Sequence, residues 1–449
     1  MRWSGWVSKN PPTLQISEDK NTRNKIMQFE NTLAFARKMD KNDPLRSFRK
    51  EFYIPKVNGK ESIYLCGNSL GLQPRSVEKH VMTEIEDWRK YGVEGHLHAR
   101  NPWLYYHHFF TKPLCDLVEG KKEEVVCMNN LTVNLNLMMV SFYRPKAKKT
   151  KIVIEGNAFP SDYYAVEQQI RFHGLDPKKN IIELLPRKGE VTLRTEDILS
   201  TLEKHKGEIA LVLLGAVNYY TGQFFDVKNI SKACQKNGLT LGLDLAHAIG
   251  NVELKLHEWK VDFATWCSYK YLNSGPGGVS GVFIHSKYAK RADLPRFAGW
   301  WGNDEKTRFK MEKHFVPKEG AEGWQLSNAP IMNMAAHKAS LEIFQRAGMK
   351  NLRKKSELLT GYLHWLLTNQ ETTVKSQLKI ITPSTPTDRG CQISLQTQKD
   401  GKKIFDRLTK AGVIADWREP DVIRVAPVPL YNSFEDVWQF SQLLTSSSR

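Results

Sequence analysis

The chain has 449 residues, 41% of them apolar, which is enough for a large core and too much for one small domain. No run of about 20 apolar residues occurs, so the sequence predicts no membrane-spanning helix. The net charge of +18 could favour nucleic acid, but the positive residues are spread along the chain, and the densest run is KAKKTK at 146–151. That run is expected to be a solvated loop. No recognised nucleic-acid motif is present, so no nucleic-acid partner is expected.

The amino terminus and the cysteines indicate the cellular compartment in which the protein is expected. Residues 1–15 lack the apolar stretch of a secretory signal and give only a faint sign of a mitochondrial presequence. The six cysteines are scattered and none forms a C-x-x-C pair. Cys127, Cys234 and Cys267 sit in or beside apolar segments and are expected to be buried thiols. This pattern predicts a reduced, cytoplasmic protein.

Up to about residue 310, strands and helices are expected to alternate along the chain. A helical period near 24–40 precedes a short strand and turn at 62–74 and an amphipathic helix at 75–92 that Gly92 ends. The next expected strands are 124–128, 151–155, 209–217, 239–247, 261–270 and 277–285. Expected helices between them are 131–142, 161–174, with Ser161 as a possible cap, and 226–238. Such alternation predicts an α/β fold with a parallel sheet buried on both faces.

The carboxy-terminal part has a different pattern. Long helices are expected at 332–348 and 352–369, followed by three strands around a helix at 401–412. These elements predict a second, smaller α+β domain that begins near 310–335. The expected division is an amino-terminal arm and helix at 1–60, associated with the small domain, a large domain at 61–320 and a small domain at 321–449.

The strongest chemical signal is an acid and an amine at the ends of neighbouring apolar segments. Asp244 closes the expected strand LTLGLDLAH, and Lys270 closes the expected strand VDFATWCSYK just before the turn NSGPGG. Ligands of open α/β sheets bind at the carboxyl ends of strands. Pyridoxal phosphate (PLP) needs both groups, since a lysine holds it covalently and an acid keeps its ring nitrogen protonated. A buried Asp–Lys salt bridge is the alternative that the spacing alone leaves open.

Two further residues favour the cofactor. Thr132 lies near the start of the expected helix 131–142, where backbone N–H groups and a hydroxyl could bind a phosphate; an ordinary helix cap is the alternative. Phe159 follows the strand KIVIE at the same edge and could stack on a ring, or simply pack in the core.

Other patterns are weaker. His96, His98, His107 and His108 cluster around RNPW, but no complementary ligand set is evident, so no metal site is expected. No dinucleotide, P-loop or G-x-S-x-G motif is present. Arg424, an isolated cation in the strand VIRVAP, could bind a carboxylate or form a structural ion pair.

These residues lie within motifs that resemble the eukaryotic kynureninases, PLP enzymes of fold type I in the aminotransferase class V group. The similarity runs from about residue 45 to 440. It is carried by FRKEFYIPK, YLCGNSLGLQP, LTVNLNLMM, AFPSD, YYTGQ, LDLAHAIGNVEL, CSYKYLN, GWWG, LSNAP and RVAPVPLYNSF. The resemblance implies a large PLP-binding domain with a mainly parallel seven-stranded sheet flanked by helices. It also implies a homodimer that cleaves L-kynurenine or 3-hydroxykynurenine in tryptophan catabolism and NAD biosynthesis.

The resemblance implies roles for individual residues. Lys270 resembles the lysine that forms the Schiff base, Asp244 the partner of the ring nitrogen, and Tyr220 a tyrosine that transfers protons. The other residues expected at the cofactor are Leu131, Thr132, Phe159, Pro160, Ser161, Asp162, His247, Tyr269 and, across a dimer interface, Trp300 and Asn328. The residues expected at the substrate are Arg424 for the carboxylate, Ser327 and Asn328 near the aryl ring, and either His96 or His98.

Two features qualify this interpretation. Relatives often carry a serine where this chain has Gly215, so a hydroxyl contact to the cofactor is expected to be lost or replaced. The cysteine desulfurases share the superfamily and form the alternative. They need a reactive cysteine on a mobile loop, whereas Cys391 lies at the entry to an expected strand and is predicted to be structural.

Overall fold

A seven-stranded sheet forms the centre of the larger lobe in the computed structural model, which describes residues 28–369 and 377–445. Its strand order is β4-β10-β9-β8-β7-β5-β6. The strands are β4 (Val125–Cys127), β5 (Lys151–Glu155), β6 (Ile181–Leu184), β7 (Ile209–Gly215), β8 (Leu241–Asp244), β9 (Phe263–Trp266) and β10 (Gly281–Ile284). Strands β6, β5, β7, β8 and β9 run parallel, whereas β10 is antiparallel to both β9 and β4. The mainly parallel seven-stranded sheet is therefore confirmed.

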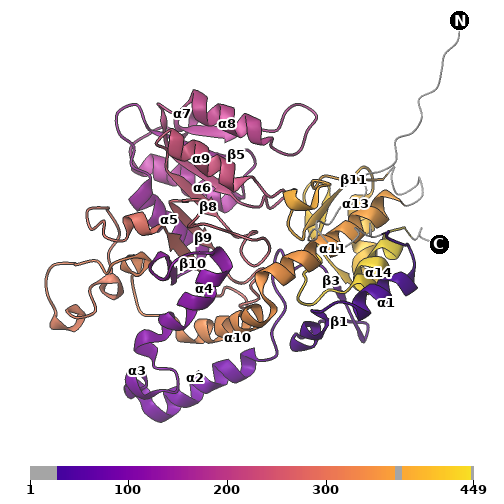
Figure 1. The fold of residues 1–449 in the computed structure, drawn as a ribbon, viewed down its shortest axis with the longest axis horizontal. Coiled ribbons are helices and arrows are strands. Elements are labelled where there is room, and N and C mark those ends of the chain that lie inside the picture. Colours follow the sequence, from indigo (N-terminus) through magenta and orange to yellow (C-terminus); the bar gives the residue numbers. More distant parts are fainter. Residues whose placement is uncertain (1–27, 370–376, 446–449) are drawn as a thin grey trace, which may run out of the picture.

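Helices lie on both faces of this sheet (Figure 1), namely α4 (Thr111–Val118), α5 (Leu131–Phe142), α6 (Pro160–Phe172), α7 (Pro177–Asn180), α8 (Thr195–Lys204) and α9 (Val227–Lys236). Helix α10 (Ile331–Ala347) packs against α4, and α2 (Val77–Tyr91) packs against α10, so that α2 and the short α3 (Gly95–His98) lie farther from the sheet. Side chains of β7 alternate between two cores, with Leu211 and Leu213 in one and Val212 and Leu214 in the other. Because successive strand residues point to opposite faces, such a continuous apolar strand requires cover on both sides.

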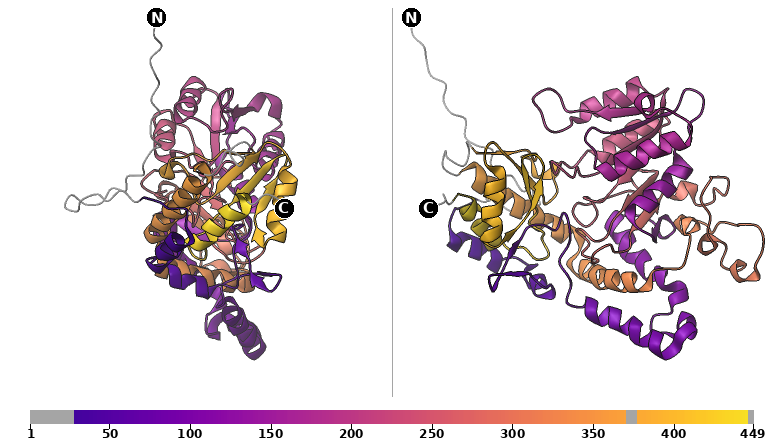
Figure 2. Two further views of the ribbon diagram at one scale, coloured as in Figure 1. Left: turned by 90° about the vertical axis from the view of Figure 1, so that its right-hand side faces the viewer. Right: turned by 180° about the vertical axis from the view of Figure 1, so that it is seen from behind.

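The smaller lobe is built on a four-stranded antiparallel sheet in the order β11-β12-β15-β14. Its strands are β11 (Leu378–Ile380), β12 (Ile393–Thr397), β14 (Asp416–Arg418) and β15 (Val422–Val425). Its helices are α11 (Met349–Thr368), α13 (Gly401–Lys410), α14 (Phe434–Thr445) and, from the other end of the chain, α1 (Leu33–Lys41). Helix α1 lies against α14, and Phe35 of α1 belongs to the core of this lobe (Figures 1 and 2). The expected α+β character of the tail is confirmed.

Short strands and 3₁₀ helices complete the fold. Strand β13 (Val413–Ile414) pairs in parallel with β3 (Ile63–Tyr64), and β1 (Lys56–Val57) pairs with β2 (Lys60–Glu61). Short 3₁₀ helices are η1 (Arg46–Glu51), η2 (Gly92–Glu94), η3 (Trp103–Phe110), η4 (Lys122–Glu124), η5 (Ser286–Tyr288), η6 (Trp300–Gly302), η7 (Arg308–Lys310), η8 (Ala321–Trp324) and η9 (Pro386–Asp388). In the described ranges, no helix is both long and apolar enough to cross a membrane.

Two local predictions were wrong. Lys270 does not close a strand, because β9 ends at Trp266 and the chain then folds back on itself, with the N–H of Ser274 donating to the carbonyl of Ser268 at 3.1 Å. Ser161 does not cap α6, because Pro160 already occupies the first helical position, which suits a residue without an N–H. The faint presequence signal concerns residues 1–15, which lie outside the described part of the chain, as do the first residues of the helix expected at 24–40.

Candidate active site

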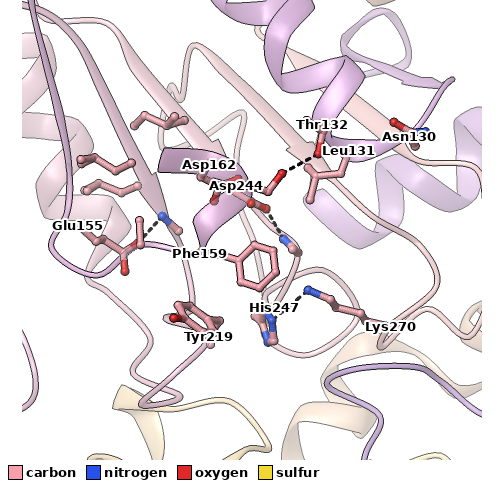
Figure 3. A pocket seen from close by; sticks show the side chains of 18 of the residues that line it. Asn130, Leu131, Thr132, Glu155, Phe159, Asp162, Tyr219, Asp244, His247 and Lys270 are labelled. Carbon is pink, nitrogen blue, oxygen red and sulfur yellow. Dashed lines mark hydrogen bonds between the residues drawn. The ribbon is translucent and has the colours of Figure 1, made fainter. Parts of the chain in front are cut away.

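A cavity of about 520 Å³ lies at the carboxyl ends of β5, β7 and β8 (Figure 3). The last residues of these strands are Glu155, Gly215 and Asp244, and all three line it. Parallel strands bring their carboxyl ends to one edge, which is where open α/β sheets bind ligands. The other residues that line it are Asn130, Leu131, Thr132, Ile154, Ala158, Phe159, Ser161, Asp162, Leu213, Leu214, Val217, Tyr219, Ala246, His247, Tyr269, Lys270, Gly277 and Gly278.

Lys270 enters the cavity from the loop that follows β9. Its Nζ lies 3.0 Å from Nε2 of His247, which follows β8 by three residues. Burial, with the Lys270 cation as the second cause, lowers the pKa of His247 well below its ordinary value. The imidazole is therefore neutral and can accept a hydrogen bond from the amine. Lys270 Nζ also lies 5.7 Å from the centre of the Phe159 ring.

Three carboxyl groups share the same cavity, and Glu155 and Asp244 are buried whereas Asp162 is half-buried. Asp244 accepts a hydrogen bond from the N–H of Ala246 at 2.7 Å. Burial and the neighbouring Asp244 carboxylate raise the pKa of Asp162 well above its ordinary value. Burial raises the pKa of Glu155 to about 7, although hydrogen bonds from Asn218 and Gly215 oppose that shift. Carboxylates this close cannot all ionise without a cation between them, so the cavity is suited to a positively charged ligand.

The start of α5 forms the opposite wall. Its cap is Asn130, whose side chain accepts from the N–H of Val133 at 3.4 Å. Thr132 is therefore not the cap, and its hydroxyl lies 2.9 Å from that of Ser161 at the start of α6 (Figure 3). The first turn of a helix presents free N–H groups and the positive end of the dipole. With Gly277 and Gly278 beside it, this wall is suited to a phosphate.

Aromatic rings enclose the space between these walls. Phe159, directly before Pro160 of α6, meets Tyr219 edge to face with ring centres 5.3 Å apart. Tyr269 and Leu131 also line the cavity. All residues expected at the cofactor from this chain, except Pro160, Trp300 and Asn328, therefore line one cavity.

Ser327 and Asn328 lie in a second, adjoining cavity of about 280 Å³, which shares Asn130 and Gly277 with the first. Trp300 approaches it from η6, since its Nε1 donates to Oδ1 of Asn328 at 3.3 Å. Trp300 is 46% exposed, so part of the residue is accessible to another surface.

Six expected residues line neither cavity, namely Pro160, His96, His98, Tyr220, Trp300 and Arg424. The Tyr220 ring lies beyond Tyr219, with ring centres 6.2 Å apart. His96 on α3 packs edge to face on Trp103, and the neighbouring His98 is exposed near Glu94.

Arg424 is buried in the smaller lobe and is held by Asp416 and by a cavity residue. Its Nε lies 2.9 Å from Asp416 Oδ1, and its Nη1 donates to the carbonyl of Tyr219 at 2.6 Å. Tyr219 itself lines the first cavity, so the guanidinium is one residue removed from the open space.

Sequence reasoning missed Glu155 and Tyr219. Glu155 is the last residue of the apolar strand KIVIE, just as Asp244 is the last residue of β8. The signal that identified Asp244, an acid at the end of a buried strand, could therefore also have identified Glu155. Gly215 explains how the acid fits: its N–H donates to Glu155 Oε1 at 2.5 Å, and a Cβ at Gly215 would lie 2.8 Å from that oxygen. The glycine therefore leaves the space that the Glu155 carboxyl occupies.

Solved structures with a similar fold include a C–S lyase that carries a PLP cofactor and a cysteine desulfurase. The mutant of the cystine C–S lyase C-DES with glycine covalently linked to its PLP cofactor matches with a TM-score of 0.72 and 16% identity, over 86% of this chain and 97% of its own. An apo cysteine desulfurase from Thermococcus onnurineus matches with a TM-score of 0.71 and 17% identity, over 88% and 96%. At such identities the likeness concerns the fold alone.

The thiols do not support desulfurase chemistry, which needs a reactive thiolate. Burial raises the pKa of all six cysteines, to about 12 for Cys391, which is fully buried before β12.

The cavity does fit PLP. Lys270 is the only lysine that lines it in the described chain, the acids supply the negative charge that a protonated ring nitrogen needs, and the start of α5 is suited to the phosphate. A salt bridge between Asp244 and Lys270, the alternative left open by the spacing, does not occur among the described residues; the amine contacts His247 instead.

We predict that Glu155→Gln changes how the stability of the cofactor-free protein depends on pH. The pKa of Glu155 is raised from 4.5 to about 7 in the folded state, so its contribution is full below pH 4.5 and is lost as pH rises through 7. At pH 8 the variant should be more stable by about 1–3 kcal/mol, and at pH 5 nearly equal. Urea unfolding across this range measures the effect. The exposed Glu183→Gln on β6 is the control, and parallel pH curves for wild type and Glu155→Gln would contradict the prediction.

Relatives of similar length share about half of the sequence. The kynureninase of Koribacter versatilis is 53% identical over 92% of this chain and 97% of its own length, and that of Myxococcus xanthus 53% over 94% and 98%. The kynureninase of the animal Nematostella vectensis is 49% identical over 92% and 93%, so identity alone does not test the eukaryotic subtype. The family model for the kynureninase C-terminal domain matches residues 352–444. The chain belongs to the kynureninase family.

Proposed function

We propose that this chain hydrolyses the Cβ–Cγ bond of L-kynurenine or 3-hydroxy-L-kynurenine, giving anthranilate or 3-hydroxyanthranilate and L-alanine. Its cofactor is pyridoxal phosphate. Family membership over more than nine-tenths of the chain supports the activity. The single structural observation that carries it is Lys270 in one cavity with Asp244 and His247, at the carboxyl edge of the sheet. The reaction belongs to tryptophan catabolism and to NAD biosynthesis.

When bound at Lys270, PLP supplies an electron sink that stabilises negative charge on the substrate carbon next to the amine. Asp244 holds the proton of the ring nitrogen, which that role requires. The Lys270 amine, once free, takes and returns protons at the substrate α-carbon. Neutral His247 accepts a hydrogen bond from Lys270 Nζ across 3.0 Å and so keeps the amine pointed into the cavity.

Tyrosine and arginine side chains complete the substrate side. Tyr219 lines the cavity, with Tyr220 behind it. We assign the proton-transferring hydroxyl to Tyr220, as the resemblance implies, with Tyr219 as the nearer candidate. Arg424 Nη1 now donates to the carbonyl of Tyr219. Arg424 binds the substrate carboxylate when this hydrogen bond is replaced by one to the substrate. Ser327, Asn328 and His96 are assigned to the aryl end.

We further propose a homodimer. Six apolar side chains of the segment 297–316 are exposed, namely Phe297, Trp300, Phe309, Met311, Phe315 and Val316. An apolar patch of this size is typical of an interface. Trp300 and Asn328 are then placed to reach the cofactor of a second copy.

The division at 1–60, 61–320 and 321–449 is retained as a proposal, supported by the separate core that Phe35 shares with the carboxy-terminal helices. In this division α10 is the part of the small domain that packs into the core of the large one. A cytoplasmic location is proposed from the free cysteines. Urea unfolding and cell fractionation, respectively, test these two assignments.

We predict that Lys270→Ala lowers kynurenine turnover by about 10²–10⁴-fold, because it removes the proton-transferring amine. Borohydride should attach the cofactor irreversibly to the peptide that carries Lys270 in the native protein, and not in the variant. Fluorescence of released anthranilate and peptide mass spectrometry are the measurements. Lys290→Ala, whose side chain is 81% exposed, is the control. Near-native turnover by the Lys270 variant would end the proposal.

For Arg424→Ala, we expect KM for kynurenine to rise about 10–100-fold while the visible absorption of the bound cofactor is retained, since a charge-assisted contact to the substrate is lost. Arg418→Ala is the matched control, because Arg418 binds the same Asp416 at 2.9 Å but has a side chain that is 35% exposed. Loss of colour, or an equal KM effect in both variants, would instead assign Arg424 a structural role.

The dimer proposal predicts complementation. Trp300→Ala and Lys270→Ala chains should each be impaired, and a mixture that exchanges subunits should regain about a quarter of wild-type turnover, because one site of each heterodimer has both native residues. Sedimentation of the same samples reports the assembly. A mixture no more active than the mean of the two variants contradicts the sharing of Trp300, and a monomer in sedimentation contradicts the dimer.

A further inference from the structure

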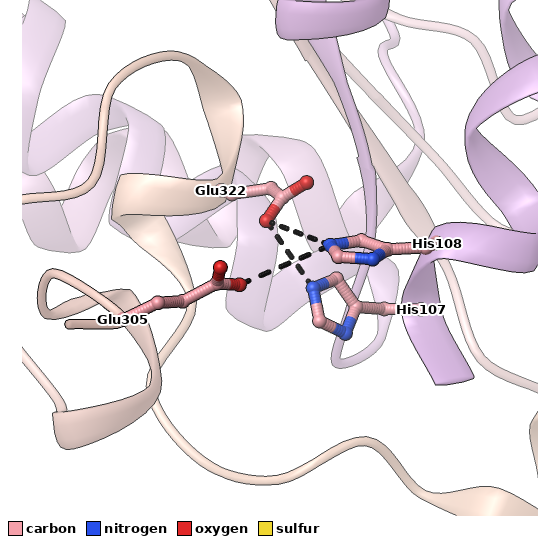
Figure 4. Close-up of side chains that lie close together, drawn as sticks. All are labelled: His107, His108, Glu305 and Glu322. Atoms are coloured by element: carbon pink, nitrogen blue, oxygen red, sulfur yellow. Dashed lines mark hydrogen bonds and ion pairs between the residues drawn. The ribbon is translucent and has the colours of Figure 1, made fainter. Parts of the chain in front are cut away.

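Two clusters of potential metal ligands occur in the described chain, both away from the cofactor cavity. One joins His107 and His108 of η3 to Glu305 and to Glu322 of η8 (Figure 4). The other joins Glu124, His257 and His285. In each, one ligand atom from every residue lies within 4.8 Å of all the others.

The second cluster has its ligand atoms already engaged. The two Glu124 oxygens accept the N–H groups of Lys121 at 2.8 Å and Ser286 at 2.7 Å. Nδ1 of His285 accepts the N–H of Lys287 at 3.1 Å, so its lone pair is directed at the backbone. Nδ1 of His257 lies 2.8 Å from Glu124 Oε1. This cluster is accounted for by the hydrogen bonds that hold η4 to η5.

The first cluster has the spacing of a four-ligand metal site. Glu322 Oε2 lies 3.2 Å from His107 Nε2 and 3.6 Å from His108 Nε2, and His108 Nε2 lies 4.0 Å from Glu305 Oε1. Tetrahedral zinc, with bonds of about 2.1 Å, separates its donor atoms by roughly 3.4 Å. Figure 4 shows the two rings and the two carboxylates pointing toward one centre from two separate segments of the chain.

Lys318 is the cation that now neutralises the two acids. Its Nζ lies 2.5 Å from Glu305 Oε1 and also contacts Glu322. A lysine amine accounts for the carboxylates, and His107 Nε2 lies within hydrogen-bond distance of Glu322 Oε2 at 3.2 Å. His108 Nε2, at 3.6 Å from Glu322 and 4.0 Å from Glu305, is too far from either carboxylate for a hydrogen bond, so its place at this centre is not explained by Lys318. The Lys318 side chain is 21% exposed on a flexible stem, so it can move outward and leave the four donors to a divalent ion.

We propose that His107, His108, Glu305 and Glu322 form a binding site for a divalent transition-metal ion such as Zn²⁺, with Lys318 as the competing internal cation. Two imidazoles and two carboxylates are a donor set that suits zinc and its neighbours in the transition series. The ion would tie η3 to Glu305 in the segment after η6 and to Glu322 in η8. Glu305 lies five residues after Trp300 and Glu322 five residues before Ser327, so the ion would restrain the segment that joins these two residues.

Metal binding is measured on the PLP-loaded protein after treatment with chelator, by equilibrium dialysis against Zn²⁺ with metal analysis. We expect one saturable Zn²⁺ per chain. His108→Gln and Glu305→Gln, both partly exposed at the rim, should each weaken binding by at least about tenfold. Co²⁺ should give the strong visible bands of tetrahedral coordination in the native protein and not in His108→Gln.

Three further variants serve as controls. They test whether zinc binds instead at the second cluster, whether it binds to ordinary surface histidines, and whether Lys318 only supports the fold. His257→Gln disables the second cluster, and His205→Gln removes an ordinary surface histidine–glutamate pair (2.8 Å); both should leave zinc binding unchanged. Lys318→Met should strengthen it, because the competing ammonium is gone, whereas a lysine that only supports the fold would leave it unchanged or weaker. Absence of a stoichiometric site, equal affinity in His108→Gln, or loss of binding in His257→Gln instead would overturn the proposal. None of these readouts depends on kynurenine turnover.

Discussion

The active-site region depends on an unbalanced set of buried charges at one edge of the sheet. Asp244, Asp162 and Glu155 face the same cavity as a single lysine, and burial raises the pKa of two of these acids. A carboxylate removed from water is costly without a partner. Binding of a cationic ring would therefore lower the electrostatic free energy of these carboxylates. This is the physical reason why a pyridine cofactor with a protonated nitrogen suits the site.

Elsewhere the protein pairs its buried charges internally. Lys355 lies 2.7 Å from Asp43 with both side chains buried, and Arg424 is held by Asp416. Such buried ion pairs stabilise the folded protein only weakly, but removing one partner destabilises it strongly, because the other charge is left buried and unpaired. Arg424 differs from Lys355 in one respect, because it also donates to the backbone of a cavity residue. The smaller lobe is thereby linked to the active site through a charge that is already neutralised, and the proposed binding of the substrate carboxylate by Arg424 would compete with that link.

Gly215 permits a close contact with Glu155. A carboxyl oxygen accepts the Gly215 N–H and lies where a Cβ at this position would crowd it. The family resemblance implies a serine here in many relatives, so that a different contact is expected in those proteins. Burial raises the pKa of Glu155 to about 7, so its protonation changes near neutral pH, beside the Asp244 carboxylate that contributes to its shift. The pH response of this enzyme is expected to depend on that acid.

The sequence by itself determined the α/β order of elements and the sheet edge that carries Asp244, because apolar periodicity and an acid at a strand end are local signals. The same kind of signal indicated Lys270, Thr132 and Phe159, whereas the other expected cavity residues were implied by the family resemblance, and Glu155 and Tyr219 were missed. Helix 131–142 and strand 151–155 agree with the structure to the residue. Only the tertiary structure decided that Lys270 reaches the cavity from a loop and that Tyr219 lines it while Tyr220 lies behind. It alone brought His107 and His108 to Glu305 and Glu322, where the sequence indicated no complementary ligands. Those ligands lie about 200 residues further along the chain, and no local pattern reports which distant loops will pack together, since that depends on how whole helices and loops fill the space around the sheet.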